Sequence, residues 1–380
     1  MKILFVTNYS GGGAEGALIE MIEACYSLNH QLYGVFNHGG FLIESCKKFL
    51  SNYSFLKQPN WVMSNPNLNI KGKIVLLFGM SISIIKMIFF ILRYNPKVVI
   101  SNGPLCYAAA FASKILRKKH VWVLHEVLKE GLGVDYIFGI DLSMNCINKL
   151  SQIIVCNSQV VKNYYEQFIP SKKLIVAYYS VECENIGEIN HNFNNTNCLN
   201  IIFVGRFFDF KNQFDAVKAV LLLKNINEKI HLTLVGANNS EYSNQITQFV
   251  YDNKLNDNIS IVNESKDIFP FFQQADCSLV CSRFEAFGRV TIEAMKCGLP
   301  VIASNIGANS ELIKDGFNGY LYKFDNPNDL ADKILMMKDA NNRNYMAKNA
   351  YEWAINTFTM ENYSKSWEEI LNNITSKNKK

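Results

Sequence analysis

The chain has 380 residues, an apolar share of 49% and a formal net charge of +5. A chain of this length is too long to fold around one ordinary hydrophobic core, so two domains are expected. The apolar share excludes a disordered chain. Residues 1–180 carry 18 Lys and Arg against 9 Asp and Glu, whereas residues 181–380 carry 20 against 24. The basic first half predicts an anionic partner, either a phosphorylated ligand or an acidic membrane face. Nucleic acid is not expected, because no finger spacing, RNP-like motif or dense basic helix accompanies the charge.

The ten cysteines form no Cys-x-x-Cys pair, and the six histidines are dispersed. Scattered cysteines in apolar runs are typical of small core residues in a reducing compartment, and no metal cluster is predicted. The first apolar run, residues 3–6, is shorter than a secretory signal requires. We therefore expect a cytoplasmic protein.

Short apolar and β-branched runs alternate with longer helical stretches along the chain. Such runs predict parallel strands buried on both faces, with helices between them. The strands expected in the first half are residues 3–7, 32–36, 97–101, 120–124, 153–156 and 174–178. Those expected in the second half are residues 199–204, 231–235, 259–262, 277–281 and 301–303. Two such sets predict an α/β protein with two doubly wound, Rossmann-like domains.

A glycine-rich loop, Gly11-Gly12-Gly13, follows the first strand and precedes a helical pattern over residues 17–28. Glycines let the backbone approach a ligand closely, and a helix start can hold an anion. The alternative is a plain strand-to-helix turn, because the dinucleotide fingerprint Gly-x-Gly-x-x-Gly is only loosely met.

Residues 74–92 form an apolar stretch long enough to span a membrane. However, Lys86 would then lie inside the hydrocarbon at high cost, and a strand follows at residues 97–101. We expect a helix of the first domain. Three alternatives remain open for it: burial in the core, docking of its apolar face on a membrane beside Lys71 and Arg93, and a true span.

Polar residues follow two further strands of the first half. His125 comes at the carboxyl end of the strand at residues 120–124, where open α/β sheets bind ligands; a structural role is the alternative. Asn157 and Ser158 follow the next strand and predict the cap of a helix. Residues 182–197 are rich in Asn and lack a helical or strand period, so they predict a linker.

In the second half, Gly205 ends a predicted strand, and Arg206 and Lys211 follow it. Gly205 permits a tight turn, and the two cations can converge on one anion. The alternative is a pair of solvated surface cations.

Residues 282–300 are the most informative stretch. Glu285 and Glu293 stand eight positions apart, Gly288 between them is the expected start of a helix, and apolar runs flank the segment. The pattern predicts strand, loop, helix and strand, with Glu285 at the carboxyl end of the first strand. Two acceptors two helical turns apart can grip the hydroxyl groups of one elongated ligand, and helix amides can hold a phosphate between them. The alternative is an acidic loop residue plus a solvated helix residue.

This stretch resembles the Glu-x7-Glu donor-binding signature of retaining glycosyltransferases of family four, which have the GT-B fold. The resemblance implies that Glu285 contacts the transferred sugar and Glu293 the nucleotide ribose. It also implies a pyrophosphate grip at Arg206 and Lys211 and a histidine, His125, near the donor sugar. The residues so assigned to catalysis are Glu285, Arg206, Lys211 and His125. The residues so assigned to donor binding are Glu293, Gly12, Gly13, Gly205, Phe287, Gly288, Arg289 and Val290.

The resemblance implies an acceptor-binding domain at residues 1–181 and a nucleotide-sugar-binding domain at 198–357, facing a cleft, with a last helix at 358–374 crossing back to the first domain. The implied reaction moves a sugar, with retention, from a nucleotide-sugar donor to a saccharide or lipid-linked saccharide acceptor, without metal or other cofactor. Such a reaction would fit bacterial surface polysaccharide biosynthesis. An anionic membrane surface is a further candidate partner, which would make the protein peripheral at the inner membrane face. The alternatives are a nucleotide-sugar epimerase of the same fold and a non-catalytic nucleotide-sugar-binding subunit.

Overall fold

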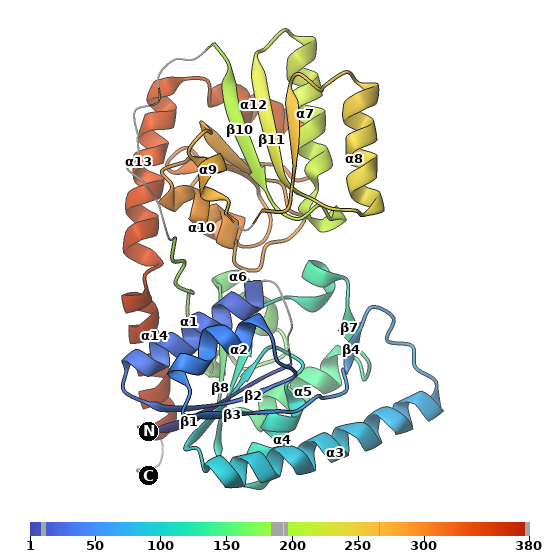
Figure 1. The fold of residues 1–380 in the computed structure, drawn as a ribbon, viewed down its shortest axis with the longest axis vertical. Helices are drawn as coiled ribbons and strands as arrows, with labels where there is room; N and C mark the ends of the chain where they lie inside the picture. Colours follow the sequence, from blue (N-terminus) through green and yellow to red (C-terminus); the bar gives the residue numbers. More distant parts are fainter. Residues whose placement is uncertain (9–12, 184–192, 194–196, 266, 377–380) are drawn as a thin grey trace. The chain divides into compact units, whose positions relative to one another are not determined.

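The computed structural model describes residues 1–8, 13–183, 193, 197–265 and 267–376. The chain divides into two compact units (Figure 1). The first unit comprises Met1–Ser180 and Thr359–Lys380, and the second comprises Val181–Phe358. Most of the predicted linker, residues 184–192 and 194–196, lies outside the described residues.

The first unit is built on a parallel sheet with helices on both sides (Figure 1). In pairing order its strands are β3 (Asn52–Phe55), β2 (Gln31–Phe36), β1 (Lys2–Thr7), β5 (Val98–Asn102), β6 (Lys119–Leu124), β8 (Ile153–Cys156) and β9 (Leu174–Val176). Its helices are α1 (Gly13–Ser27), α2 (Phe41–Cys46), α3 (Ile70–Tyr94), α4 (Tyr107–Ile115), α5 (Ile140–Leu150), α6 (Gln159–Tyr165) and α14 (Met360–Ser376). The central strands are buried on both faces, as Ile3, Val98 and Val99 illustrate, because helices cover the sheet on either side.

The last helix, α14, belongs to the first unit and packs against α1. Its inner face is Tyr363, Trp367, Ile370 and Leu371, all buried. This spacing of three and four residues is the helical pattern that the sequence contains.

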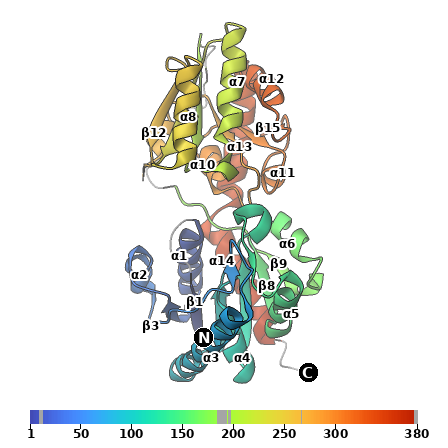
Figure 2. The same cartoon turned by 90° about the vertical axis from the view of Figure 1, so that its right-hand side faces the viewer.

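The second unit repeats the architecture with its own parallel sheet (Figure 2). In pairing order its strands are β12 (Ile259–Asn263), β11 (Ile230–Ala237), β10 (Leu199–Val204), β13 (Cys277–Val280), β14 (Val301–Ser304) and β15 (Gly319–Tyr322). Its helices are α7 (Gln213–Asn225), α8 (Glu241–Asp252), α9 (Phe269–Phe272), α10 (Arg289–Lys296), α11 (Asn309–Leu312), α12 (Pro327–Met336) and α13 (Ala340–Thr357). The predicted fold class, two doubly wound α/β sheets with the last helix returned to the first unit, is confirmed.

Two strands of the large parallel sheets were not predicted, and neither was the two-stranded sheet of β4 (Val62–Met63) and β7 (Asp135–Tyr136). The edge strand β3 consists of Asn52-Tyr-Ser-Phe55 and has largely exposed side chains, so it lacks an apolar run. The other edge strand, β15, follows Gly316 and Asn318 and reads as part of a turn. As an exposed edge strand, β3 is less constrained by burial than a central strand is. Strand β15 is mostly buried, but its four residues include no β-branched side chain.

Helix α3 confirms a helix at residues 74–92 but not its burial. Met80, Met87 and Ile91 face the core, whereas the opposite face is apolar and exposed. The exposed large apolar residues on this helix are Ile70, Ile74, Val75, Leu77, Phe78, Ile82, Ile85, Phe89 and Leu92. In the described part of the chain, α3 is the one helix whose length and composition would suffice to cross a membrane. Core burial of the whole helix is therefore wrong.

Candidate functional site

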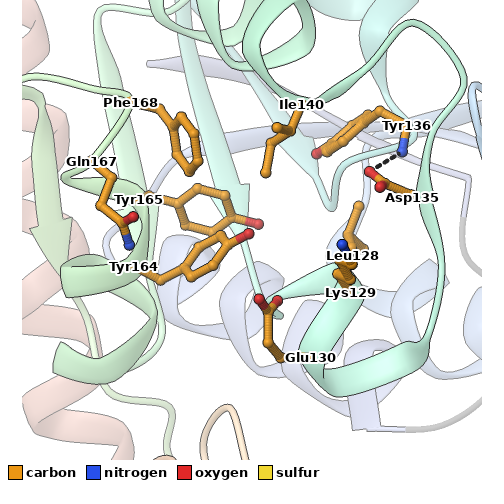
Figure 3. Close-up of a pocket in the computed structure, with 10 residues that line it drawn as sticks. All are labelled: Leu128, Lys129, Glu130, Asp135, Tyr136, Ile140, Tyr164, Tyr165, Gln167 and Phe168. Atoms are coloured by element: carbon orange, nitrogen blue, oxygen red, sulfur yellow. Dashed lines mark hydrogen bonds between the residues drawn. The ribbon is translucent and has the colours of Figure 1, made fainter.

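A polar and aromatic pocket of the first unit lies between the short π-helix at Leu128–Leu132 and the end of α6 (Figure 3). None of the predicted site residues lines it. Most of the predicted donor residues lie instead in the second unit.

In the second unit, β10, β13 and β14 are neighbouring parallel strands, so their carboxyl ends meet at one edge of the sheet. The loop after β10 carries Lys211, at the end of a short helical turn (Asp209–Lys211). The loop after β13 carries Ser282 and Glu285. This edge is where open α/β sheets bind ligands.

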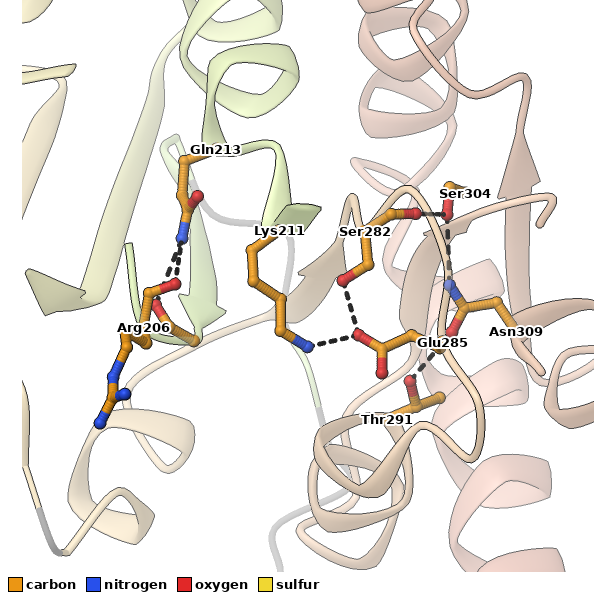
Figure 4. Close-up of polar contacts among 9 residues, drawn as sticks. Arg206, Lys211, Gln213, Ser282, Glu285, Thr291, Ser304 and Asn309 are labelled. Atoms are coloured by element: carbon orange, nitrogen blue, oxygen red, sulfur yellow. Dashed lines mark hydrogen bonds and ion pairs between the residues drawn. The ribbon is translucent and has the colours of Figure 1, made fainter. Parts of the chain in front are cut away.

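Glu285 is the centre of the cluster at this edge. Its Oε1 atom accepts hydrogen bonds from Lys211 Nζ at 2.6 Å and from Ser282 Oγ at 2.6 Å (Figure 4). The side chain of Glu285 is 15% exposed and that of Lys211 is 35% exposed. The pair is therefore partly shielded but open enough to exchange partners with a ligand.

The loop after β14 fixes the backbone of Glu285. The Ala308 amide donates to the Glu285 carbonyl at 2.7 Å. Gly307 has φ 64°, and a Cβ on it would lie 2.4 Å from the Glu285 carbonyl oxygen. Ser304 Oγ also donates to the Ser282 carbonyl at 2.7 Å. Neither Ser282 nor Gly307 was among the predicted site residues, because both act through contacts that sequence spacing does not reveal.

Arg206 lies apart from this cluster. Its Nε donates to Glu264 Oε1 at 2.8 Å, and both side chains are largely exposed, at 73% and 47%. Figure 4 shows the guanidinium directed away from Lys211. The structure thus does not bring the two predicted cations together. Because an exposed ion pair contributes little free energy, Arg206 can leave Glu264, and its role stays a prediction.

The turn after β10 depends on a glycine that was not predicted. Gly205 itself has room, since a Cβ there would meet only side-chain carbons, the nearest at 3.5 Å. Gly236, at the end of β11, has φ 123°, and a Cβ on it would lie 2.4 Å from the Gly205 carbonyl oxygen. The buried Gln213 amide holds the same turn by donating to the carbonyls of Gly205 and Arg206 at 3.3 and 3.1 Å.

Replacing Gly236 with Ala is therefore expected to lower the free energy of unfolding by at least about 2 kcal/mol, through left-handed strain and collision with the Gly205 backbone. Gly205→Ala is the matched control and should change it by less than about 1 kcal/mol. Urea unfolding followed by circular dichroism measures both. Equal losses in the two variants would contradict this account of the turn.

Helix α10 begins directly after the Glu285 loop. Gly288 caps it with φ 81°, and a Cβ there would lie 2.7 Å from Leu312 Cδ1. The first amides of such a helix have no carbonyl partner within the helix and favour an anion. Of the predicted donor residues nearby, Phe287 is buried against Phe358, with ring centroids 5.9 Å apart, and Val290 is half-buried. Phe287 therefore packs in the core and orients the loop.

Glu293 lies on α10 with its side chain 17% exposed, and its Oε1 is 3.5 Å from Arg289 Nε. Burial raises the pKa of the Glu293 carboxyl above its ordinary value, and the positive charge of Arg289 partly offsets this rise. A carboxylate whose charged form is disfavoured by burial is a strong hydrogen-bond acceptor for ligand hydroxyl groups.

The remaining predicted residues belong to the first unit. Gly12 lies outside the described residues, and Gly13 begins α1. His125, after β6, is buried: its Nε2 is 2.6 Å from Asn102 Oδ1, and its Nδ1 is hydrogen-bonded to the Tyr179 hydroxyl. Burial lowers the pKa of His125 to about 4, so the ring is neutral at pH 7. Ser158 caps α6 as predicted, its Oγ accepting from the Val161 amide at 3.1 Å.

Within the described ranges, no group of three or more His, Cys, Asp or Glu side chains could hold a metal ion. The cation nearest to Glu285 is the Lys211 ammonium. The arrangement can therefore orient a hydroxylated ligand at Glu285 and Glu293 and offer positive charge and helix amides to an anion between them.

Residues 188–353 match the model of a family described as "Glycosyl transferases group 1". Among curated proteins, the chain is 28% identical over 256 residues to the uncharacterized glycosyltransferase MJ1178 of Methanocaldococcus jannaschii, covering 66% of this chain and 67% of the relative. It is 28% identical over 163 residues to the capsular polysaccharide biosynthesis glycosyltransferase CapH of Staphylococcus aureus, covering 43% and 45%. Among solved structures, HepE of Anabaena in complex with UDP and glucose aligns with a TM-score of 0.76 at 20% identity, over 98% of this chain and all of that one. This last likeness shows the fold.

Proposed function

Since this chain is a glycosyltransferase and its residues 188–353 belong to the glycosyl transferases group 1 family, we propose that it moves a sugar from a nucleotide-sugar donor to a saccharide or lipid-linked saccharide acceptor, with retention at the anomeric carbon. The observation that carries the proposal is the contact of Glu285 with Lys211 and Ser282 beside the start of α10. In it, an acceptor for sugar hydroxyls and a cation for the leaving phosphate lie next to each other.

The chemistry that these residues supply is electrostatic. As the bond between the anomeric carbon and the diphosphate breaks, negative charge grows on the departing phosphate oxygen. Lys211 and the first amides of α10 stabilise that charge, and Arg206 joins them after leaving Glu264. The acceptor oxygen forms its bond to the anomeric carbon on the face that the diphosphate leaves, and the leaving phosphate oxygen takes the acceptor proton, so no separate base is required. With these cations and amides present, the transfer proceeds without a metal ion.

Glu293 anchors the ribose in this proposal, and the first amides of α10 hold the diphosphate. The UDP and glucose bound to HepE support a uridine diphosphate sugar as the first donor to test. The capsular role in the name of CapH supports a place in surface polysaccharide synthesis.

Replacing Glu293 with Gln is expected to weaken UDP binding about tenfold and to raise the thermal midpoint of the ligand-free chain at pH 7 by about 2 °C. Because the pKa of Glu293 is raised in the folded chain, its contribution to stability is complete below the unfolded pKa and is lost as the pH rises through the folded pKa. Because Gln cannot ionise, the higher thermal midpoint of the variant should appear only at pH values above the ordinary pKa of a Glu carboxyl.

Thermal unfolding from about pH 4 to pH 8, with and without UDP, measures both effects. Glu352→Gln, an exposed change on α13, is the matched control. Unaltered UDP binding in Glu293→Gln would remove the ribose role from this residue.

The transfer itself is tested by incubating the chain with UDP-sugars and glycan acceptors. The proposal predicts that sugar leaves UDP only when an acceptor is present, with the anomeric configuration kept. Release of free sugar and UDP without an acceptor would instead indicate an epimerase, and absence of any turnover with bound nucleotide would indicate a binding subunit.

We further propose that the protein is cytoplasmic and that α3 rests on an anionic membrane surface. Ile74, Phe78, Ile85 and Phe89 fall on one face of the helix and are 60%, 69%, 66% and 60% exposed. The helix carries Lys71, Lys73, Lys86 and Arg93 and no acidic residue. Exposed apolar patches of this extent mark interaction sites, and basic flanks favour anionic lipid. A lipid-linked acceptor would be reached from such a position.

A further inference from the structure

The pocket of the first unit has a volume of about 260 Å³. It lies between the π-helix at Leu128–Leu132, the short strand Asp135–Tyr136, the start of α5 and the end of α6 (Figure 3). Single π-turns occur frequently at functional sites. The volume falls just below the lower end, about 300 Å³, of the usual range for small-molecule pockets, which suits one ring and not an oligosaccharide chain.

Tyr136 is the first sign that the pocket takes a ligand. The residue is 3% exposed, and within the described residues its hydroxyl has no hydrogen-bond partner. Its ring is fixed edge-on to Trp61, with centroids 5.5 Å apart. Figure 3 shows the hydroxyl directed into the pocket. Since buried polar groups are almost always satisfied, a ligand hydroxyl would supply the missing partner.

Two carboxylates define the chemistry of that ligand. Glu130 is exposed on the π-turn, and Asp135 accepts from the Tyr136 amide through Oδ1 at 2.7 Å. Glu130, Asp135 and Tyr164 all line the pocket. Burial, together with the negative charges of Glu130 and Asp135, raises the pKa of Tyr164 to about 12. Carboxylates bind hydroxyl groups and repel phosphate, and here they outnumber the lysine that lines the pocket, Lys129.

Aromatic rings form the opposite wall. Tyr164 lies 5.1 Å from Tyr165 and 5.9 Å from Phe168, measured between ring centroids. Such rings can cover the C–H face of a sugar, and the Tyr164 hydroxyl can meet its edge, whereas the Tyr165 hydroxyl donates to the Glu126 carbonyl at 2.7 Å. A tyrosine and carboxylate pocket would also suit a small cation, so the two ligand classes must be separated by experiment.

We propose that this pocket binds one neutral sugar ring of the acceptor. The inference rests on the proposed function, in that the acceptor is a saccharide. Tyr136 and Glu130 bind ring hydroxyls, and the aromatic wall binds the ring face. The pocket therefore selects the acceptor by the sugar unit that it admits.

The test is ligand-observed NMR on the full chain with saturating UDP present, so that the donor site is filled. The probes are glucose, galactose, N-acetylglucosamine and rhamnose, with choline as the cation and glucose 1-phosphate as the anion. At least one neutral sugar should bind, and Tyr136→Phe and Glu130→Gln should each weaken it about three- to tenfold. The control variants Tyr251→Phe and Glu241→Gln change exposed residues on α8 and should leave sugar binding unaltered.

Thermal midpoints and UDP binding distinguish a loss of sugar binding from a loss of folding and from a failure of the proposed function. Tyr136→Phe removes an unpaired buried hydroxyl, so its thermal midpoint should not fall, and its UDP binding should equal that of the unchanged protein. The inference is overturned if UDP binds but Tyr136→Phe leaves the affinity for every neutral sugar unchanged. It is also overturned if choline or glucose 1-phosphate binds more tightly than every sugar. Failure of any nucleotide diphosphate to bind would instead count against the proposed function.

Discussion

Replacing Glu285 with Gln is expected to reduce sugar transfer by roughly 10²–10³-fold, the loss typical of removing one preorganised electrostatic contact from an active site. The Gln amide oxygen can still accept from Ser282, but it carries no charge to hold Lys211, which is 2.6 Å from the carboxylate. Because the side chain is 15% exposed and its loop is held by backbone contacts, folding should survive the change. Initial rates with a UDP-sugar and an acceptor measure the effect.

Lys211→Met should produce a loss of similar size, since the two groups act on one leaving bond. The double variant should then lose little more than either single variant, because contributions of residues that act as a unit are not additive. Glu241→Gln, exposed on α8, is the matched control and should leave the rate unchanged. Transfer by Glu285→Gln at more than half the normal rate would remove Glu285 from the site.

Replacing Phe78 and Phe89 together with Ser is expected to weaken binding to anionic vesicles by at least about 100-fold. Burial of each Phe is worth about 1.5–3 kcal/mol, and a factor of ten corresponds to about 1.4 kcal/mol. The two residues lie eleven positions apart on α3 and are 69% and 60% exposed, so their removal should not disturb the core. Vesicle flotation at fixed ionic strength measures the change.

The matched control replaces two exposed aromatics of the second unit, Tyr251 and Tyr345, which are 68% and 55% exposed. That variant should float as the unchanged protein does. Raising the salt concentration should weaken binding through the four basic side chains of α3. Binding to anionic vesicles that is no stronger than to neutral vesicles would contradict membrane docking, and α3 would then require a protein partner.

The central strands of both sheets and the edge strands β9 and β12 could be predicted from the sequence, whereas the edge strands β3 and β15 could not. The segment from β13 through α10 to β14 is marked by two apolar runs, a glycine and a helical pattern, each forced by burial. The edge strand β3 is largely exposed, and β15 is buried but consists of Gly-Tyr-Leu-Tyr, so neither strand has an apolar β-branched run. For α3 the composition fixed a helix, but a helix that is apolar nearly all round gives no periodic signal to show which face is exposed.

At the candidate site, residue types were easier to predict than their contacts. The resemblance to family-four glycosyltransferases placed Glu285 and Lys211 in the same site, and the structure pairs them directly. The same reasoning joined Arg206 to Lys211, whereas the side chain of Arg206 contacts Glu264, which no motif indicated. The glycine requirement was assigned to Gly205, but the close backbone approach falls on Gly236, in a neighbouring strand. Such contacts arise from the register of β10 and β11 and not from sequence proximity.

Lys211 and Glu285 form an ion pair with each other. In the proposed mechanism, the diphosphate of an incoming donor must compete with Glu285 for the Lys211 ammonium, and the carboxylate that is released can bind the sugar of the same donor. A nucleotide without a sugar would displace the carboxylate and offer it no hydroxyl group in return. On this proposal, the ion pair favours the intact donor over the spent nucleotide and assists product release.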